Sequence, residues 1–139
     1  MYSAEDIRQI DLMDYLREKP GRYFRGGEFD PVEMAQMLAG EPILVGASTV
    51  HISRRGRWLV VESDVDWLRE VEDVVFERII PFPDAGPNSM FAEVLLMAFA
   101  RSVATGSAAG VRVIKGADAG PLAGSTPRGR SVAFEPPLS

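Results

Sequence analysis

A layered α+β domain is the fold that this sequence predicts, and three observations support it. Apolar residues recur at helical spacing in the segments 7–16 and 34–38. Apolar and polar residues alternate on both sides of a basic turn at 54–57, which is typical of a β-hairpin. An almost continuous apolar segment follows at 88–106. With 139 residues, 46% of them hydrophobic, the chain fits a single domain over residues 1–139.

Charge and composition disfavour several classes of function. The net charge of −5 and the pI of about 4.9 disfavour an extended contact with nucleic acid, which needs clustered Lys and Arg. The absence of cysteine excludes disulfides and cysteine-based metal sites, and it favours a reducing compartment. The N-terminus lacks the pattern of a signal peptide, and no apolar run reaches the ~20 residues of a membrane span. We therefore expect a cytoplasmic protein that does not bind a membrane.

The first predicted helix occupies the N-terminal segment. Ser3 and Asp6 resemble a capping box, and apolar residues follow at helical spacing up to residue 16. The pair Pro20–Gly21 should end the helix. Tyr23 and Phe24 should then pin the following connector to the core.

A second helix is predicted to begin at Asp30. Asp30 suits the N-cap position, and Pro31 suits the first helical position, where its missing N–H is not needed. The methionines and leucine of segment 34–38 should face the core, as flexible filler rather than a cofactor site. We expect Gly40 and Pro42 to stop the helix.

The residues from Asn88 to Gly106 predict a central helix. The segment has good helix formers and no interior Gly or Pro, and Asn88 or Ser89 can cap its first turn. Gly106 stands where a left-handed C-terminal residue belongs. Apolar residues cover nearly the whole circumference, so other elements should pack on several sides of this helix. The polar residues that need water or a partner are Glu93, Arg101 and Ser102.

Three further stretches predict β-structure. Residues 47–53 and 58–62 form a hairpin, in which Val50 and Ile52 should face inward. The arginines at 54, 55 and 57 should keep this edge soluble, and an anionic partner is the alternative. Residues 111–115 form a third strand, before a Gly/Pro/Ser/Ala-rich segment at 117–130 that we expect to be a flexible loop. Residues 131–135 form a last strand, which should lie at the edge of the sheet.

An acidic stretch from Glu62 to Glu77 has apolar residues between its carboxylates. This pattern predicts a short helix with one solvated face, which runs into an extended piece from Val74 to Ile80. A divalent-metal cluster would need carboxylates that converge from several elements, and neighbours on one helix seldom converge. The only histidine, His51, has no second metal-ligating His or Cys nearby. We therefore predict no metal site.

The order of these elements, together with one short motif, resembles the ATP-binding domain of the DNA gyrase B subunit and the wider GHKL (Bergerat-fold) superfamily. Residues 17–24, Arg-Glu-Lys-Pro-Gly-Arg-Tyr-Phe, are similar to the family's Arg-x-Arg-Pro-Gly-Met-Tyr-Ile motif. Residues 37–40 resemble the end of its first ATP-site helix, 50–61 its hairpin, 89–113 the helix and strand after its second glycine box, and 125–136 its Gly-Thr-Thr-Val-x-Phe-x-Pro strand. The resemblance implies a two-layer sandwich, in which helices cover one face of a mixed, mostly antiparallel sheet.

The groups with which this family handles ATP are mostly replaced here. Glu33 in one register, or Glu28 in another, stands for the general base, but no Asn is present on this helix to hold Mg²⁺. Asp64 corresponds to the Asp that accepts from the adenine amino group. Val65 and Trp67 put bulk where the family has glycines.

The phosphate-binding lid of the family corresponds to a shortened segment at 84–88. Gly86 and Asn88 are the candidates that remain there for phosphate, whereas Pro87 lacks a backbone N–H. The acids between 62 and 77 would also repel a polyanion. The resemblance therefore implies a degenerate ATP site with no catalytic residue, no metal and no cofactor, and we expect no enzymatic activity.

Two functions follow as hypotheses. The first is a non-catalytic, gyrase-B-like domain that binds or regulates another protein, through the acidic surface at 64–73 or the arginine turn at 54–57. The second is a residual nucleotide or small-molecule binder, with Asp64 on the base and Glu33 or Glu28 near the phosphate. A third alternative is a small α+β domain that is unrelated to the GHKL family. We favour the first, with another protein as the partner.

Overall fold

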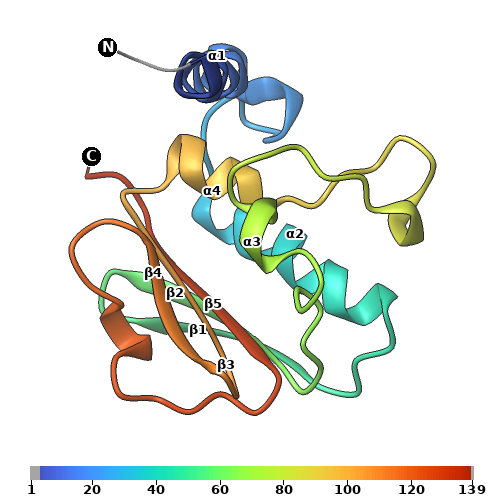
Figure 1. Cartoon of the computed structure of the whole chain (residues 1–139), viewed down its shortest axis with the longest axis vertical. Helices are drawn as coiled ribbons and strands as arrows, with labels where there is room; N and C mark the ends of the chain where they lie inside the picture. Colours follow the sequence, from blue (N-terminus) through green and yellow to red (C-terminus); the bar gives the residue numbers. More distant parts are fainter. Residues whose placement is uncertain (1–3, 139) are drawn as a thin grey trace.

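The chain forms two layers, with helices on one face of a five-stranded sheet (Figure 1). This computed structural model describes the backbone of residues 4–138 and the side chains of residues 11–138. The strand order is β1-β2-β5-β3-β4, and every pairing between these strands is antiparallel. The predicted α+β sandwich is therefore confirmed. The expected mixed character of the sheet is wrong, because the described strands include no parallel pair.

The helices and strands have the following bounds. The helices are α1 (Ala4–Glu18), α2 (Pro31–Leu44), α3 (Glu72–Val75) and α4 (Glu93–Phe99). The strands are β1 (Val50–Arg55), β2 (Trp58–Ser63), β3 (Ser102–Ser107), β4 (Gly110–Lys115) and β5 (Arg130–Glu135). Short 3-10 turns lie at Pro20–Arg22, Pro83–Ala85 and Gly120–Leu122. Within residues 4–138, none of the helices has both the length and the apolarity of a membrane span.

The first helix and its connector agree with the sequence prediction. The inner side of α1 carries Met13 and Leu16, which are buried. Ser3 and the side chain of Asp6 lie outside the described residues, so the proposed capping box stays a prediction. In the connector, Phe24 is buried and Tyr23 packs against the core. The connector is therefore anchored by its aromatic pair, as predicted.

Helix α2 begins as predicted but ends later than expected. Asp30 caps it, because Oδ1 accepts hydrogen bonds from the N–H groups of Val32 (3.0 Å) and Glu33 (3.2 Å). The helix then continues through Gly40 and Pro42 to Leu44. A proline this close to the C-terminus removes only one intrahelical hydrogen bond, and the Pro42 carbonyl still accepts from Ala47 N–H at 2.9 Å.

The predicted central helix is too long at both ends: α4 begins only at Glu93, and its N-cap residue is Ala92 rather than Asn88 or Ser89. Helix α4 ends at Phe99, and residues 102–107 form β3, in which every residue is buried. Gly106 is a strand residue without a left-handed backbone. A Cβ there would come within 3.1 Å of Pro127 and Val111, so glycine allows a close approach. An apolar run without alternation suits a buried strand as well as a buried helix, which explains the error.

The last strand lies at the centre of the sheet, not at its edge. β5 pairs with β2 on one side and with β3 on the other. Its neighbours Val132 and Ala133 point to opposite faces, and both are fully buried. Burial on both faces is what an interior strand requires, and this is the physical reason for the correction.

Strand β1 is the edge strand, and this position changes one predicted orientation. The hairpin of β1 and β2 is confirmed, with a positive φ of 61° at Gly56 in its turn. Val50 packs against the core, as expected. Ile52 points to the same face by the alternation of a strand, yet it is 45% exposed. The prediction that Ile52 is buried is therefore wrong, because the helical layer leaves this side chain uncovered.

The acidic stretch forms less regular structure than the sequence predicted. Its helix, α3, has only four residues, and Val74 and Val75 belong to it rather than to an extended piece. Extended pairing occurs only at Pro81, which forms an isolated antiparallel bridge with Met90. The valines are helical because Val71 C=O accepts from the N–H groups of both, at 3.0 and 2.8 Å.

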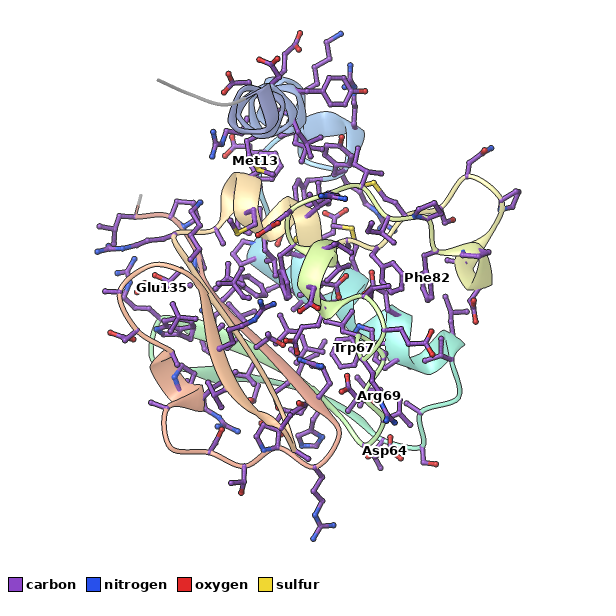
Figure 2. All side chains as sticks on the ribbon, in the orientation of Figure 1. Met13, Asp64, Trp67, Arg69, Phe82 and Glu135 are labelled. Atoms are coloured by element: carbon purple, nitrogen blue, oxygen red, sulfur yellow. The ribbon has the colours of Figure 1, made fainter. Side chains whose placement is uncertain are left out.

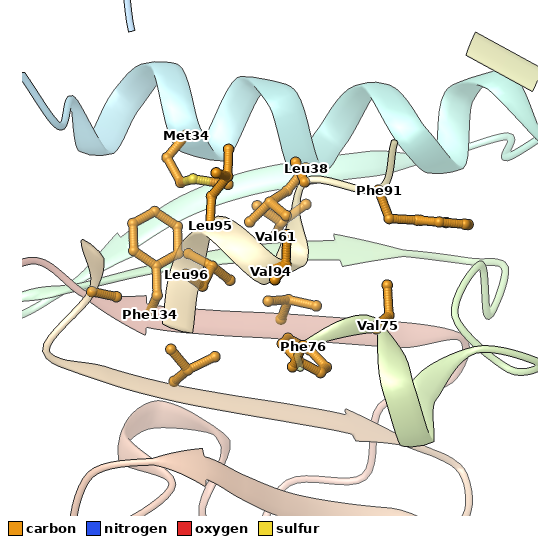
Figure 3. Close-up of a cluster of buried hydrophobic side chains, with 14 of the residues drawn as sticks. Met34, Leu38, Val61, Val75, Phe76, Phe91, Val94, Leu95, Leu96 and Phe134 are labelled. Carbon is orange, nitrogen blue, oxygen red and sulfur yellow. The ribbon is translucent and has the colours of Figure 1, made fainter. Parts of the chain in front are cut away.

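The main core lies between the helices and the sheet (Figure 3). Leu38 of α2 and Leu96 of α4 point toward Val61 and Phe134 of the strands, and all four are fully buried. A smaller cluster covers the opposite face of the sheet, where Leu122 from the segment 117–130 packs on strand residues. Burying a large apolar side chain stabilises the fold by roughly 1.5–3 kcal/mol, so the helical layer supplies most of the stability.

Candidate functional site

The two carboxylates that the family resemblance singled out bind backbone amides. Asp64 Oδ1 accepts hydrogen bonds from the N–H groups of Ser48 (3.0 Å) and Thr49 (3.1 Å). The carboxylate oxygens of Glu33 both accept from Arg25 N–H at 3.3 Å. Glu28, the alternative in the other register, is exposed. Asp64 and Glu33 therefore stabilise local loop conformations.

The other two candidates lie in the loop before α4. Gly86 has a φ of 132°, and its carbonyl accepts from Ser89 N–H at 3.2 Å. Asn88 is exposed. Asp64 lines a hollow of about 460 Å³ between the β1–β2 hairpin and segment 122–128, and the other three candidates do not line it. The structure does not bring the four residues together in that hollow.

Aromatic side chains fill the region where the helical layer meets the loop after β2. Trp67, Phe82 and Phe91 are each less than 10% exposed. The rings of Phe82 and Phe91 stack with centroids 4.4 Å apart. In Figure 2, Asp64 lies at the lower rim of the molecule and Trp67 lies farther inside. Trp67 thus takes up interior space next to Asp64, for which the family resemblance predicts a contact with adenine.

Beneath these rings lies a buried pair of acidic residues, Glu41 of α2 and Glu93 of α4. The indole Nε1–H of Trp67 donates to Glu41 Oε1 (3.1 Å) and to Glu93 Oε2 (3.2 Å). Glu41 Oε2 also accepts from Ala92 N–H at 2.7 Å. Glu93 Oε1 is buried without a hydrogen-bond partner among the described residues. We name this group the carboxyl pair.

Burial changes the protonation of the carboxyl pair. Loss of hydration raises the pKa of Glu41 to about 11, and the charge and hydrogen bond of Glu93 add to the shift. Burial likewise raises the pKa of Glu93. Glu41 is therefore protonated at neutral pH. Such a group resembles a structural amide more than an acid that can exchange protons with a substrate.

A second buried polar group surrounds Arg130 at the start of β5. Its side chain is 2% exposed, and its guanidinium donates to Asp66 Oδ1 at 2.7 Å and to Asp66 Oδ2 at 2.9 Å. It also donates to Glu72 and to Thr105 Oγ1. Burial would lower the pKa of Arg130, but the hydrogen bonds and charges of Asp66 and Glu72 outweigh it and raise the pKa. We name this group the arginine cluster.

The sequence suggested two charged surfaces for partners, and on both of them some charged side chains pair with other residues of the same chain. In the acidic surface, Asp66 and Glu72 bind Arg130, and Asp64 binds backbone amides. In the arginine turn, Arg55 pairs with Glu62 at 2.9 Å and Arg57 with Glu135 at 3.5 Å. Part of the charge on each surface is therefore paired within the chain.

An uncharged surface remains beside the free edge of the sheet. Leu38 of α2 faces the sheet, and Glu41 faces Glu93 of α4. Successive residues of a helix are about 100° apart, so the side of α2 opposite Glu41 faces away from α4 and toward the β1 edge. Val32, Gln36 and Ile43 occupy that side, and all three are exposed. Ile52 of β1 is exposed on the same face of the sheet. We call these four residues the α2–β1 surface.

The described residues also limit metal chemistry. No group of three or more His, Asp or Glu side chains within them is placed to hold a metal ion. Comparisons with protein-family models, with curated proteins and with solved structures find no significant match.

Sequence reasoning missed the residues that dominate the interior. Glu93 stands out in the sequence as a polar exception in an apolar run, but its partner Glu41 does not, because it follows the supposed helix stop at Gly40. Arg130 falls in the predicted loop rather than in the last strand. A single charged residue inside an otherwise apolar element is a signal of a buried polar group, and it was available for Glu93 but not for Glu41 or Arg130.

Proposed function

We propose that this protein is a non-catalytic, GHKL-like domain that binds a protein partner through the α2–β1 surface. Its ATP site is degenerate in this proposal. The candidate nucleotide ligands Asp64 and Glu33 accept hydrogen bonds from backbone N–H groups of nearby loops. The carboxyl pair and the aromatic rings that pack on it fill the neighbouring interior. These features support a scaffold role and disfavour a nucleotide-binding one.

One observation carries the proposal, namely the apolar outward side of α2. A surface helix normally turns charged residues to solvent. In α2 the only charged residues are Glu33, which accepts from Arg25 N–H, and Glu41, which is buried. Val32 and Ile43 are 50% and 60% exposed. The outward side of α2 thus carries no charge and exposes an apolar side chain near each end, and such a side is a candidate interaction surface that a partner is expected to cover.

Site-specific photo-crosslinking tests the proposal. A photoreactive residue at position 43 should give a covalent adduct with a protein in extracts of the native host. The same residue at position 79 is the control, because Ile79 is a comparably exposed isoleucine outside the α2–β1 surface. Equal labelling from both positions, or none from position 43, would overturn the proposed partner site.

Calorimetry tests the absence of nucleotide binding. Titration of Mg-ATP should give no heat of binding in the micromolar range. The melting temperature should also stay unchanged, because a ligand at 100 times its dissociation constant would stabilise the fold by about 2.7 kcal/mol. Micromolar Mg-ATP binding that is lost in Asp64→Ala would overturn this part and favour a residual nucleotide binder.

A further inference from the structure

We propose that the partner on the α2–β1 surface is a second copy of this chain, related to the first by a two-fold axis. The inference rests on the proposed function and gives its partner an identity. It is argued from the spacing of residues along α2, from the position of β1, and from the distribution of charge.

The outward stripe of α2 suits self-association because both of its ends are apolar. Val32, Gln36, Ala39 and Ile43 follow the spacing i, i+4, i+7, i+11, so they form one line along the helix, in which Ala39 is 7% exposed and the other three are exposed. In an antiparallel pair of α2 helices, Val32 would face Ile43 of the second copy, and Gln36 would face Ala39. The two-fold axis would then pass between Met37 and Leu38. An isologous interface needs a patch that is complementary to itself in this way.

Strand β1 offers a second contact centred on the same axis. The middle of β1 lies between Ile52 and Ser53. From the α2 midpoint to Leu44 is about 10 Å at 1.5 Å per residue, and from Val50 to the β1 midpoint is about 8 Å at 3.3 Å per residue. Since the chain reverses between α2 and β1, the two midpoints lie at nearly the same level. The same two-fold axis can therefore relate the two α2 helices and the two β1 strands of the dimer.

The backbone of β1 can extend the sheet into the second copy. Among the strands of residues 4–138, β1 pairs with β2 alone, so its outer edge faces no other described strand. A two-fold axis through an antiparallel pair passes between two copies of the same residue, because directly opposed residues point to the same face. With the axis at Ile52, Ile52 faces Ile52 of the second copy and Arg54 faces Val50. No arginine then faces another arginine, so the basic turn does not oppose this register. The sheet remains antiparallel across the axis.

Charge favours a second copy over a different protein. The chain has a net charge of −5, so the repulsion between two copies is smallest where the facing surfaces carry no charge. Val32, Gln36, Ile43 and Ile52 carry none. A dedicated partner of an acidic protein would usually bring complementary positive charge, and this surface has no acidic group to attract it.

Sedimentation equilibrium with a matched pair of variants tests the dimer. The wild-type protein should reach twice the chain mass of 15.2 kDa in the micromolar range. Ile52→Lys should weaken the dimer by about tenfold or more. Val113→Lys should leave it unchanged, because Val113 lies on β4 at the other edge of the sheet with similar exposure, 43% against 45%. A monomeric wild type, or equal effects of the two variants, would overturn the inference.

A charge-pair rescue tests the two-fold geometry. Val32→Glu and Ile43→Lys each suit their end of the helix dipole, so both variants should fold. Each alone should dissociate the dimer, whereas the double variant should restore it in low salt, because the carboxylate introduced at position 32 then faces the ammonium introduced at position 43 of the second copy. The two positions are about 16 Å apart within one chain, too far to pair internally. Dissociation that persists in the double variant would overturn the proposed register.

The crosslinking experiment separates this inference from the proposed function. An adduct from position 43 with the mass of two chains supports both. An adduct with a different protein, from a chain that stays monomeric, overturns the second-copy inference and leaves the proposed function in place. Absence of any adduct overturns both.

Discussion

The arginine cluster and the carboxyl pair are both buried polar groups beside the same loop, but they deal with charge in opposite ways. Arg130 has two carboxylate partners and a hydroxyl, and its guanidinium stays charged. Glu41 and Glu93 have no cation in direct contact and share one indole donor. The first group keeps its charge by pairing, and the second loses it by protonation.

This difference teaches which group constrains the fold more strongly. A buried charge leaves an uncompensated partner when it is removed, whereas a neutral acid can be replaced by an amide of the same shape. The arginine cluster should therefore tolerate little change. The carboxyl pair should tolerate an isosteric change, and its main effect should be on the pH dependence of the free energy of unfolding.

The largest effect is expected for Arg130→Met. The substitution leaves Asp66 without its cation and leaves Glu72 with Arg112 alone, and it should lower the free energy of unfolding by about 3 kcal/mol in urea titrations. Arg112→Met is the control, since Arg112 also pairs with Glu72, at 3.4 Å, but from a half-exposed position. The control should cost less than about 1 kcal/mol. Equal losses would remove the distinction between buried and exposed pairing.

A smaller loss is expected for Trp67→Phe. Phenylalanine keeps most of the apolar contact but removes the indole N–H that donates to both members of the carboxyl pair. Unsatisfied buried acceptors should then cost about 2 kcal/mol of unfolding free energy. The matched control is Trp58→Phe, because no hydrogen bond of the Trp58 indole is found among the described residues. An unaltered Trp67→Phe protein would mean that the indole N–H is not needed.

The carboxyl pair should make stability depend on pH. The pKa of Glu41 is raised from 4.5 to about 11 in the folded state, so its contribution is complete below pH 4.5 and is lost as the pH rises toward 11. This group alone gives a slope of at most about 1.4 kcal/mol per pH unit. Glu41→Gln should flatten the profile and make the variant more stable than wild type at pH 9. Parallel profiles in urea titrations at pH 5, 7 and 9 would contradict the assignment.

The smallest effect is expected for Asp64→Ala. Asp64 is exposed, and its removal releases only the N–H groups of Ser48 and Thr49 to water. The loss should stay below about 1 kcal/mol in thermal unfolding. A much larger loss would mean that Asp64 contributes as much to stability as the residues of the buried clusters do.

Alternation and turn residues predicted much of the sheet. The β1–β2 hairpin and β4 were found because polar residues interrupt them at period two and glycines end them. β3 was missed because all of its residues are buried, so it lacks that period and reads as a continuation of α4. The strand order depends on contacts between distant residues, and local patterns do not contain it.

The site was harder to predict than the fold. Asp64 and Glu33 were singled out by a resemblance, and their side chains turn out to hold backbone amides, which is a common role for exposed acids near turns. Glu41 and Arg130 are distinguished by burial, which is a property of the packed structure. The GHKL relationship itself stays a prediction.

The central place of β5 has a consequence for how the molecule assembles. The β1–β2 and β3–β4 hairpins do not touch through backbone pairing, and residues 130–135 are the seam that joins them. Each hairpin can form early from local contacts. The sheet is complete only when residues 130–135, near the end of the chain, pair with both β2 and β3. Folding should thus be limited by a long-range closure step, and a peptide that mimics residues 130–135 should compete with it and trap an open form.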